Sequence, residues 1–89
     1  MISKYEIHIT TPQTLYELLN TLQSKGVGVD FIMKEGDSGE LKIKFPSVST
    51  IDTFGLKFYK FKDGMYTYEL GGHSKECLVK MEEIANMIG

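Results

Sequence analysis

The sequence predicts an α+β domain of element order β-α-β-β-β-β-α, built as a mixed five-stranded sheet with two helices on one face. Three observations predict it: apolar and polar residues alternate near the start of the chain, two segments carry apolar residues at helical spacing, and an Asp-Gly pair separates two aromatic-rich runs. The chain has 89 residues with no linker or low-complexity stretch, so residues 1–89 are expected to form a single domain.

The first strand is predicted at about residues 4–10, where Tyr5, Ile7 and Ile9 alternate with polar residues. Alternation with a period of two is typical of a strand that buries one face. His8 would then lie on the opposite, open face of the sheet.

A helix is expected over about residues 12–25. Thr11 suits the N-cap and Pro12 the first helical position, because the missing N–H of proline would be unpaired there anyway. Four leucines follow at i, i+3, i+4 and i+7, which makes one apolar stripe, and Gly26 stands where a helix-ending glycine belongs.

The second and third strands are predicted at about residues 27–35 and 40–45, separated by a polar, glycine-containing turn. Pro46 ends the third strand, since proline cannot donate a hydrogen bond to a neighbour. In the second strand, one face is expected to carry Val27, Val29, Phe31 and Met33. The open face would then carry Asp30, Ile32 and Lys34 from that strand.

The rest of the chain predicts a hairpin and a second helix. Residues 47–54 could be a loop, a short helical turn or an irregular edge. Leu56–Phe61 and Met65–Leu70 flank Lys62-Asp63-Gly64, and Asp-Gly between such runs is a clear hairpin signal. A final helix is expected at about residues 74–88, where apolar residues recur at helical spacing.

The predicted crossover between the first two strands is right-handed, so these strands are expected to be parallel. The two hairpins are antiparallel, which gives a mixed sheet. The register of the aromatic hairpin stays open, because either Leu56 with Phe58 or Tyr59 with Phe61 could face the core.

Composition disfavours several classes of protein. The chain has 12 acidic residues against 10 basic ones, and all the basic residues are lysine. A nucleic-acid-binding domain usually has a basic surplus, and arginine makes the bidentate contacts to phosphate and guanine. No apolar run is long enough for a signal peptide or a membrane span, and the single Cys77 suits a reducing cytoplasm.

The turn at residues 35–40 is the most suggestive local feature. Glu35, Asp37 and Glu40 lie within six residues, beside a serine and two glycines. Carboxylate and carbonyl oxygens are the ligands that calcium takes in proteins, so the turn is a candidate for weak calcium binding. The spacing is not that of an EF-hand loop, and an ordinary solvated hairpin turn would need the same residue types.

Lysines lie beside aromatic residues in the segment 57–62, with Tyr66 and Tyr68 across the turn. Stacked bases and paired phosphates would suit such a surface, so single-stranded nucleic-acid binding is one alternative. The competing interpretation is a hairpin whose aromatics face the core while lysines protect an edge.

His73 and Cys77 are four residues apart and could share a helix face. Two ligands do not make a zinc site. Cys77 also fits the apolar stripe of the last helix, where a buried cysteine acts as a small hydrophobe. We find no phosphate loop, no nucleophile elbow and no paired carboxylates for glycoside chemistry, and therefore expect no enzyme.

The run from Lys44-Phe45-Pro46-Ser47 through Lys62–Leu70, together with the helix that ends in Met81–Ala85, resembles small uncharacterised α+β proteins of methanogenic archaea. The resemblance covers about half of the chain and includes no catalytic motif. Calcium binding has been suggested in that group, so the resemblance implies the same for the turn at residues 35–40.

The sequence thus predicts a cytoplasmic, non-enzymatic binding or accessory domain, with weak calcium binding through Glu35, Asp37 and Glu40 as the leading hypothesis. One alternative is a protein-interaction module or homodimer that uses the open face of the sheet, where tyrosine-rich strands supply contact area. The other is single-stranded nucleic-acid binding through the hairpin at residues 57–68, which the composition disfavours. No cofactor other than calcium is expected.

Overall fold

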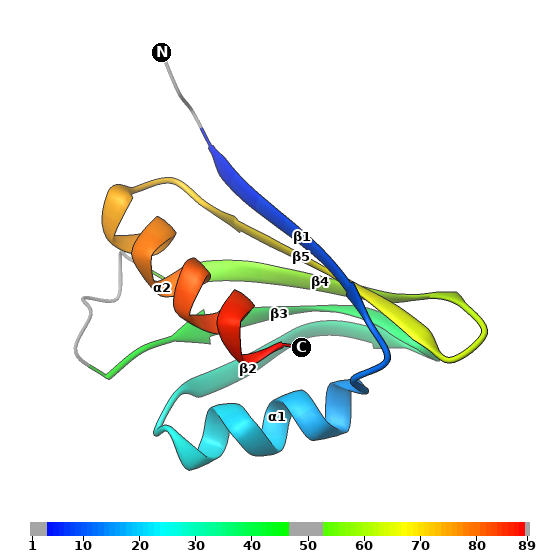
Figure 1. Cartoon of the computed structure of the whole chain (residues 1–89). Coiled ribbons are helices and arrows are strands. Elements are labelled where there is room, and N and C mark those ends of the chain that lie inside the picture. The colour runs from blue at the N-terminus through cyan, green and yellow to red at the C-terminus, as the bar shows by residue number, and fades with distance from the viewer. Residues whose placement is uncertain (1–3, 47–52, 89) are drawn as a thin grey trace.

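The strands and helices follow the predicted order. The computed structural model describes residues 4–46 and 53–88. Figure 1 shows the seven elements: β1 (Tyr5–Thr11), α1 (Leu15–Ser24), β2 (Gly28–Glu35), β3 (Ser38–Lys44), β4 (Phe54–Lys62), β5 (Met65–Gly72) and α2 (Lys75–Met87). The sequence left the structure of residues 47–54 open, and residues 47–52 of this segment lie outside the described residues. β4 begins at Phe54, two residues earlier than expected.

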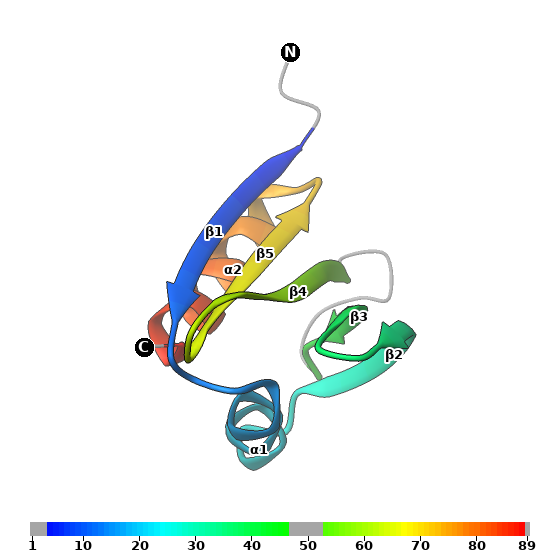
Figure 2. The same cartoon turned by 90° about the vertical axis from the view of Figure 1, so that its right-hand side faces the viewer.

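The five strands form one sheet in the order β1-β5-β4-β3-β2, and every neighbouring pair is antiparallel. The predicted mixed sheet is therefore wrong. β1 pairs with β5 from Tyr5↔Gly72 to Thr11↔Tyr66, so β1 and β2 lie at opposite edges (Figure 2). The physical reason is that β2 to β5 pair consecutively and fill the positions between the two strands that α1 connects.

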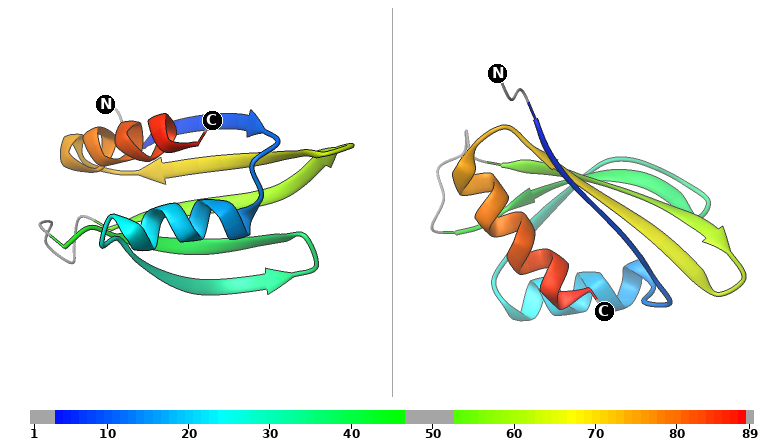
Figure 3. Two further views of the ribbon diagram at one scale, coloured as in Figure 1. Left: turned by 60° about the horizontal axis from the view of Figure 1, so that its bottom comes forward. Right: turned by 45° about the horizontal axis from the view of Figure 1, so that its top comes forward.

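Both helices pack on one face of the sheet, here called the inner face (Figure 3). α2 lies against β1 and β5, and α1 lies closest to β2. One cluster of buried side chains joins the helices to the inner face: Leu18, Leu22, Val27, Leu41, Ile43, Phe54, Leu56, Phe58, Tyr68, Leu70, Cys77, Met81, Ile84 and Ile88. The open register of β4 is thereby resolved, since Leu56 and Phe58 face the core.

Two glycines allow the tight turns. Gly36 has φ 60° at the first position of the two-residue turn between β2 and β3, and Gly64 has φ 71° in the predicted Asp-Gly hairpin between β4 and β5. A side chain is strained in this left-handed region, which glycine enters freely. The Asp-Gly hairpin prediction is confirmed.

The helix α1 begins three residues later than the sequence suggested. Its N-cap is Thr14, whose hydroxyl accepts from the backbone N–H of Glu17, while the Glu17 carboxylate accepts from the backbone N–H of Thr14. This is a capping box, and it satisfies amides that the first turn leaves unpaired. Thr11 instead accepts from the N–H of Gln13 in the turn before the helix. Gly26, with φ 76°, follows the helix as predicted.

Replacing Thr14 with alanine should lower the free energy of unfolding by about 1 kcal/mol, because the first turn loses its cap. Hydrogen bonds with the backbone and side chain of Thr14 lower the pKa of Glu17 from its ordinary value of 4.5. A lowered carboxyl pKa stabilises the fold above the unfolded value and loses that effect as pH falls. Urea denaturation should therefore show that the difference in free energy of unfolding between wild type and Thr14→Ala becomes smaller below about pH 4.5.

The control for this prediction is Thr21→Ala, which removes a hydroxyl from the middle of α1 that donates only to the Glu17 carbonyl. This change should alter the stability by less than about 0.5 kcal/mol. Equal losses in the two variants would contradict the capping role of Thr14.

β2 departs from regular strand geometry at its centre. Its pairing with β3 shifts between Phe31↔Leu41 and Met33↔Glu40, so one extra residue, Ile32, is inserted as a bulge. A bulge changes which side of the sheet the following residues face. Phe31 lies on the inner face with Leu41, Met33 lies on the outer face with Glu40, and Lys34 returns to the inner face opposite Gly39.

Candidate functional site: a hollow between α1 and β2

An apolar hollow of about 250 Å³ lies on the inner face, between the N-terminal half of α1 and the end of the sheet that holds the β2–β3 turn. Elements far apart in the sequence contribute its walls. Its lining consists of Thr14, Leu15, Tyr16, Leu19, Phe31, Lys34, Gly36, Asp37, Phe58 and Tyr66.

The floor of the hollow depends on a glycine in β3. Gly39 is opposite Phe58 of β4 and Lys34 of β2 on the inner face. A Cβ atom at Gly39 would lie 2.8 Å from Cζ of Phe58, which places the aromatic ring directly across this backbone. The absence of a side chain at Gly39 thus lets the Phe58 ring lie close to β3, where it forms apolar floor under the hollow.

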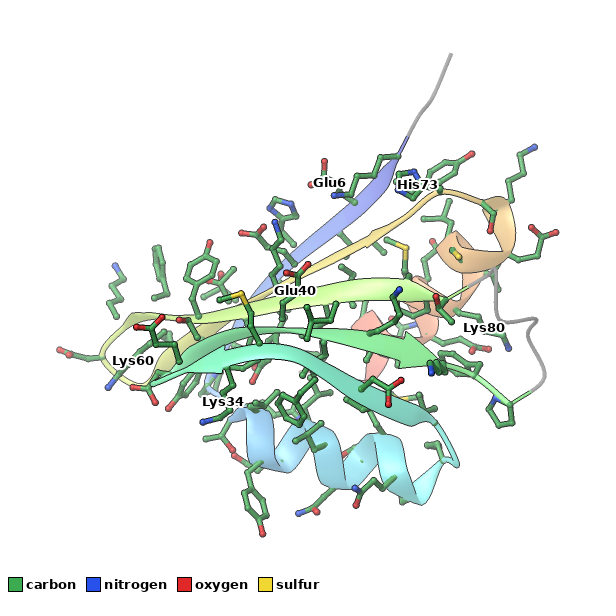
Figure 4. The ribbon with its side chains drawn as sticks, turned by 180° about the vertical axis from the view of Figure 1, so that it is seen from behind. Glu6, Lys34, Glu40, Lys60, His73 and Lys80 are labelled. Atoms are coloured by element: carbon green, nitrogen blue, oxygen red, sulfur yellow. The ribbon has the colours of Figure 1, made fainter. Side chains whose placement is uncertain are left out.

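The polar groups of the hollow stand at its rim. Lys34 extends from β2 toward the first turns of α1 (Figure 4), and its ammonium donates to the carbonyl of Gly36 at 3.2 Å. Within residues 4–46 and 53–88, no carboxylate lies at ion-pair distance from Lys34, and no lysine or histidine lies at ion-pair distance from Asp37. The rim therefore offers one cation and one anion without a charged partner in the described chain.

Large apolar side chains are exposed around the same place. Tyr16 of α1 is 76% exposed, and Phe31, Ile32 and Met33 of β2 are 49%, 56% and 54% exposed. Isolated exposed apolar residues are ordinary, but three in succession on an edge strand beside an apolar hollow are not. Val79 on α2 is the exposed apolar residue of the described helices that lies away from this region.

The sequence placed Lys34 on the open face and so missed the hollow. The bulge at Ile32 moves Lys34 to the inner face, next to α1. The run Phe31-Ile32-Met33 was the available signal, because three apolar residues in succession break the alternation of a regular strand.

The three carboxylates of the predicted calcium turn point to different places. Asp37 borders the hollow on the inner side, whereas Glu40 borders a shallow depression on the outer face. Glu35 is paired with Ser38 at the end of β2. In the described part of the chain, no group of three or more His, Cys, Asp or Glu side chains is placed to hold a metal ion. Calcium binding at this turn stays a prediction without a converging ligand set.

The outer face carries charges of both signs in cross-strand register. Lys57 is flanked by Glu40 on β3 and Glu69 on β5, and these side chains border a depression of about 80 Å³ floored by two glycines. Asp30 forms an ion pair with Lys44 on the same face. Glu6 and Glu40 both appear on this side in Figure 4. A face on which lysines stand beside carboxylates suits solvent better than it suits phosphate groups.

The lysine-rich hairpin is likewise less suited to nucleic acid than its sequence suggested. Phe58 and Tyr68 face the core, and the hydroxyl of Tyr59 has a hydrogen bond with Glu69 that raises the pKa of Tyr59. Lys62 lies over the ring of its own neighbour Phe61, at 5.4 Å from the centroid. Two of the aromatics needed for base stacking are thus buried, and a third is beside a carboxylate.

Cys77 is part of the buried core. The sulfur is buried and lies 3.7 Å from the carbonyl oxygen of Thr53. The N-cap of α2 is Ser74, whose hydroxyl accepts from the N–H of Cys77 at 3.1 Å, so the helix begins after His73. His73 itself is exposed near the start of that helix.

Fold and hollow together define a small α+β domain with a five-stranded antiparallel sheet, two helices on one face and one apolar recess beside an edge strand. No family model matches the chain, and comparisons with curated proteins and with solved structures find no match either. Neither of the described helices has the length and apolar character needed to cross a lipid bilayer.

Proposed function

We propose that this domain is a non-enzymatic, cytoplasmic protein-interaction module that accepts an apolar side chain of its partner in the hollow between α1 and β2. The observation that carries the proposal is the hollow itself, bordered by the exposed rings of Tyr16 and Phe31. The interaction surface is thus on the inner side of the β2 edge and not on the open sheet face.

The size of the hollow favours a side chain over a cofactor. Pockets for cofactors and drug-sized molecules enclose roughly 300–1,000 Å³, whereas this one encloses about 250 Å³. Burying one large apolar side chain there would contribute about 2 kcal/mol, which a module can use as an anchor but which needs further contacts for micromolar affinity.

The distribution of exposed apolar surface supports the same proposal. Phe31 would be covered together with Tyr16 by a partner that enters the hollow, because both rings line it. Aromatic residues are enriched in interfaces, while lysine, glutamate and aspartate, which populate the outer face, are depleted.

The proposal is tested by selecting a random linear peptide library, displayed on phage, against the immobilised domain. We expect enrichment of peptides with one or two large apolar residues. Their synthetic forms should bind at least tenfold more weakly to Phe31→Glu and to Tyr16→Glu, because both changes place a charge at the mouth of the hollow. Isothermal titration calorimetry measures the affinities.

The matched control is Val79→Glu, which places the same charge on a comparably exposed apolar position of α2. Binding to this variant should equal binding to wild type. A library that yields no binder, or binders with the same affinity for Phe31→Glu as for wild type, would overturn the proposed function.

A further inference from the structure

The free edge of β2 is the structural feature that distinguishes one kind of partner from another. Among the residues that the structure describes, β2 is the last strand of the sheet and pairs only with β3. Its other edge therefore presents N–H and C=O groups that make no strand contact in the described chain. Such an edge is a ready template for one more strand.

The hollow lies beside this same strand. Phe31 and Lys34 of β2 form one wall, and Leu15, Tyr16 and Leu19 of α1 form the other. The left view of Figure 3 shows α1 running alongside β2. An extended peptide on the β2 edge would direct alternate side chains toward the inner face. One of them would then meet the hollow while the backbone pairs with β2, which is the strand-addition mode of peptide recognition.

Lys34 at the rim of the hollow defines one chemical feature of such a peptide. On the outer face of β2, Asp30 is already paired with Lys44. The Lys34 ammonium, in contrast, has a carbonyl acceptor on Gly36 and no carboxylate partner in the described residues. An acidic residue next to the apolar anchor would pair with Lys34 at the edge of the hollow.

A second copy of the chain fits the edge less well. Two copies could pair their β2 strands antiparallel, with Met33 opposite Met33 and with both outer faces on the same side. In this register Asp30 would lie opposite Glu35 of the second copy, and Phe31 would lie opposite Lys34 of the second copy. Like charges directly opposite each other destabilise a strand pair.

We infer that the partner segment is an extended peptide that adds to the free edge of β2, places an apolar side chain in the hollow and carries an acidic residue opposite Lys34. This inference rests on the proposed function and names the partner's conformation and charge. An amphipathic helix or a small apolar molecule could fill the hollow, but neither would use the β2 backbone.

The test is an N-methyl scan of the tightest peptide obtained from the library. Methylation removes one backbone donor at a time and leaves the side chains unchanged. In an added strand, alternate amides point toward β2, so methylation at alternate positions should weaken binding about tenfold while the intervening positions change it little. Isothermal titration calorimetry measures each affinity.

The pairing of the peptide's acidic residue with Lys34 is tested by exchanging the two charges. Changing the peptide's acidic residue to its amide should weaken binding to wild type up to about fivefold, and should have no effect on Lys34→Gln. Lys34→Glu should bind the original peptide poorly and regain affinity when that acidic residue becomes lysine. Lys25→Gln, at the other end of α1, is the matched control and should bind as wild type does.

The outcomes separate this inference from the function on which it rests. A uniform methylation scan, in a peptide that Phe31→Glu still weakens, would overturn strand addition and leave the hollow as the binding site. Concentration-dependent dimerisation that Phe31→Glu abolishes, measured by sedimentation, would assign the edge to a second copy and overturn the inference. A library without binders would overturn both.

Discussion

Gly39→Ala should destabilise the domain by about 2–3 kcal/mol, because the interior around this residue has no room for a methyl group. A Cβ atom there would lie 2.6 Å from the carbonyl oxygen of Met33 and 2.8 and 2.9 Å from two atoms of the Phe58 ring. The backbone oxygen belongs to the bulged part of β2 and cannot move without disturbing the ladder. Urea denaturation followed by circular dichroism measures the loss.

The matched control is Gly55→Ala. Gly55 is also a strand glycine, but a Cβ atom there would be no closer than 3.9 Å to its nearest neighbour, which is ordinary contact. This variant should be as stable as wild type or slightly more stable, since alanine restricts the unfolded chain. If the two variants lose a similar free energy of unfolding, the close packing of Phe58 over Gly39 is not the reason that this position needs a glycine.

Gly39→Ala also connects the fold to the proposed function. A methyl group at Gly39 would push the Phe58 ring away from β3 and into the floor of the hollow. Peptide affinity should therefore fall in Gly39→Ala under conditions where the variant is still folded, and should be unchanged in Gly55→Ala.

Tyr68→Ala should lower the free energy of unfolding by about 3–5 kcal/mol, the largest effect expected of any substitution considered for this domain. Tyr68 is the largest of the fully buried side chains and lies between Ile9 and Phe58 on the inner face. Its removal would leave a cavity at the centre of the core. The hydroxyl donates to the carbonyl of Gln13 at 2.7 Å, so the variant also loses the link from β5 to the turn before α1.

Tyr68→Phe separates the hydroxyl from the ring and should cost only about 1 kcal/mol at neutral pH. Burial raises the pKa of Tyr68 above its ordinary value of 10.0. A raised pKa means that the folded state disfavours the tyrosinate, so the stabilisation is complete below about pH 10 and is lost as pH rises further. Denaturation curves collected across this range should show wild type losing stability more steeply than Tyr68→Phe. Parallel losses would contradict the role of burial at Tyr68.

The local structure was largely predictable because it depends on neighbours in the sequence. Alternation identified β1, the leucine spacing identified α1, and Asp63-Gly64 identified the hairpin between β4 and β5. The strand order was not predictable in the same way. Alternation shows that β1 buries one face, but it does not show which strand lies beside β1. Both β2 and β5 have an apolar inner face, so either strand could have been the neighbour of β1.

The exact helix start and the hollow were missed for more specific reasons. Thr11 and Pro12 suit a helix start, but Thr14 and Glu17 together satisfy two amides and define the stronger cap. Predicting the hollow requires knowledge of the bulge at Ile32, because the bulge moves Lys34 to the inner face. The bulge in turn depends on the register between β2 and β3. The carboxylates of residues 35–40 are close in sequence, but alternation along β3 and the turn send Asp37 and Glu40 to opposite faces.

The place of β1 in the sheet has a consequence for how the chain folds during synthesis. β2, β3 and β4 each pair with the next strand along the chain, whereas Thr10 of β1 meets Thr67 of β5 across 57 positions. Closing so long a loop costs more chain entropy than closing a hairpin. Among the described strands, the one that is made first therefore has its neighbour in the one that is made last. Until β5 has emerged, Ile7 and Ile9 have no neighbouring strand, so β1 stays available to chaperones that bind nascent chains.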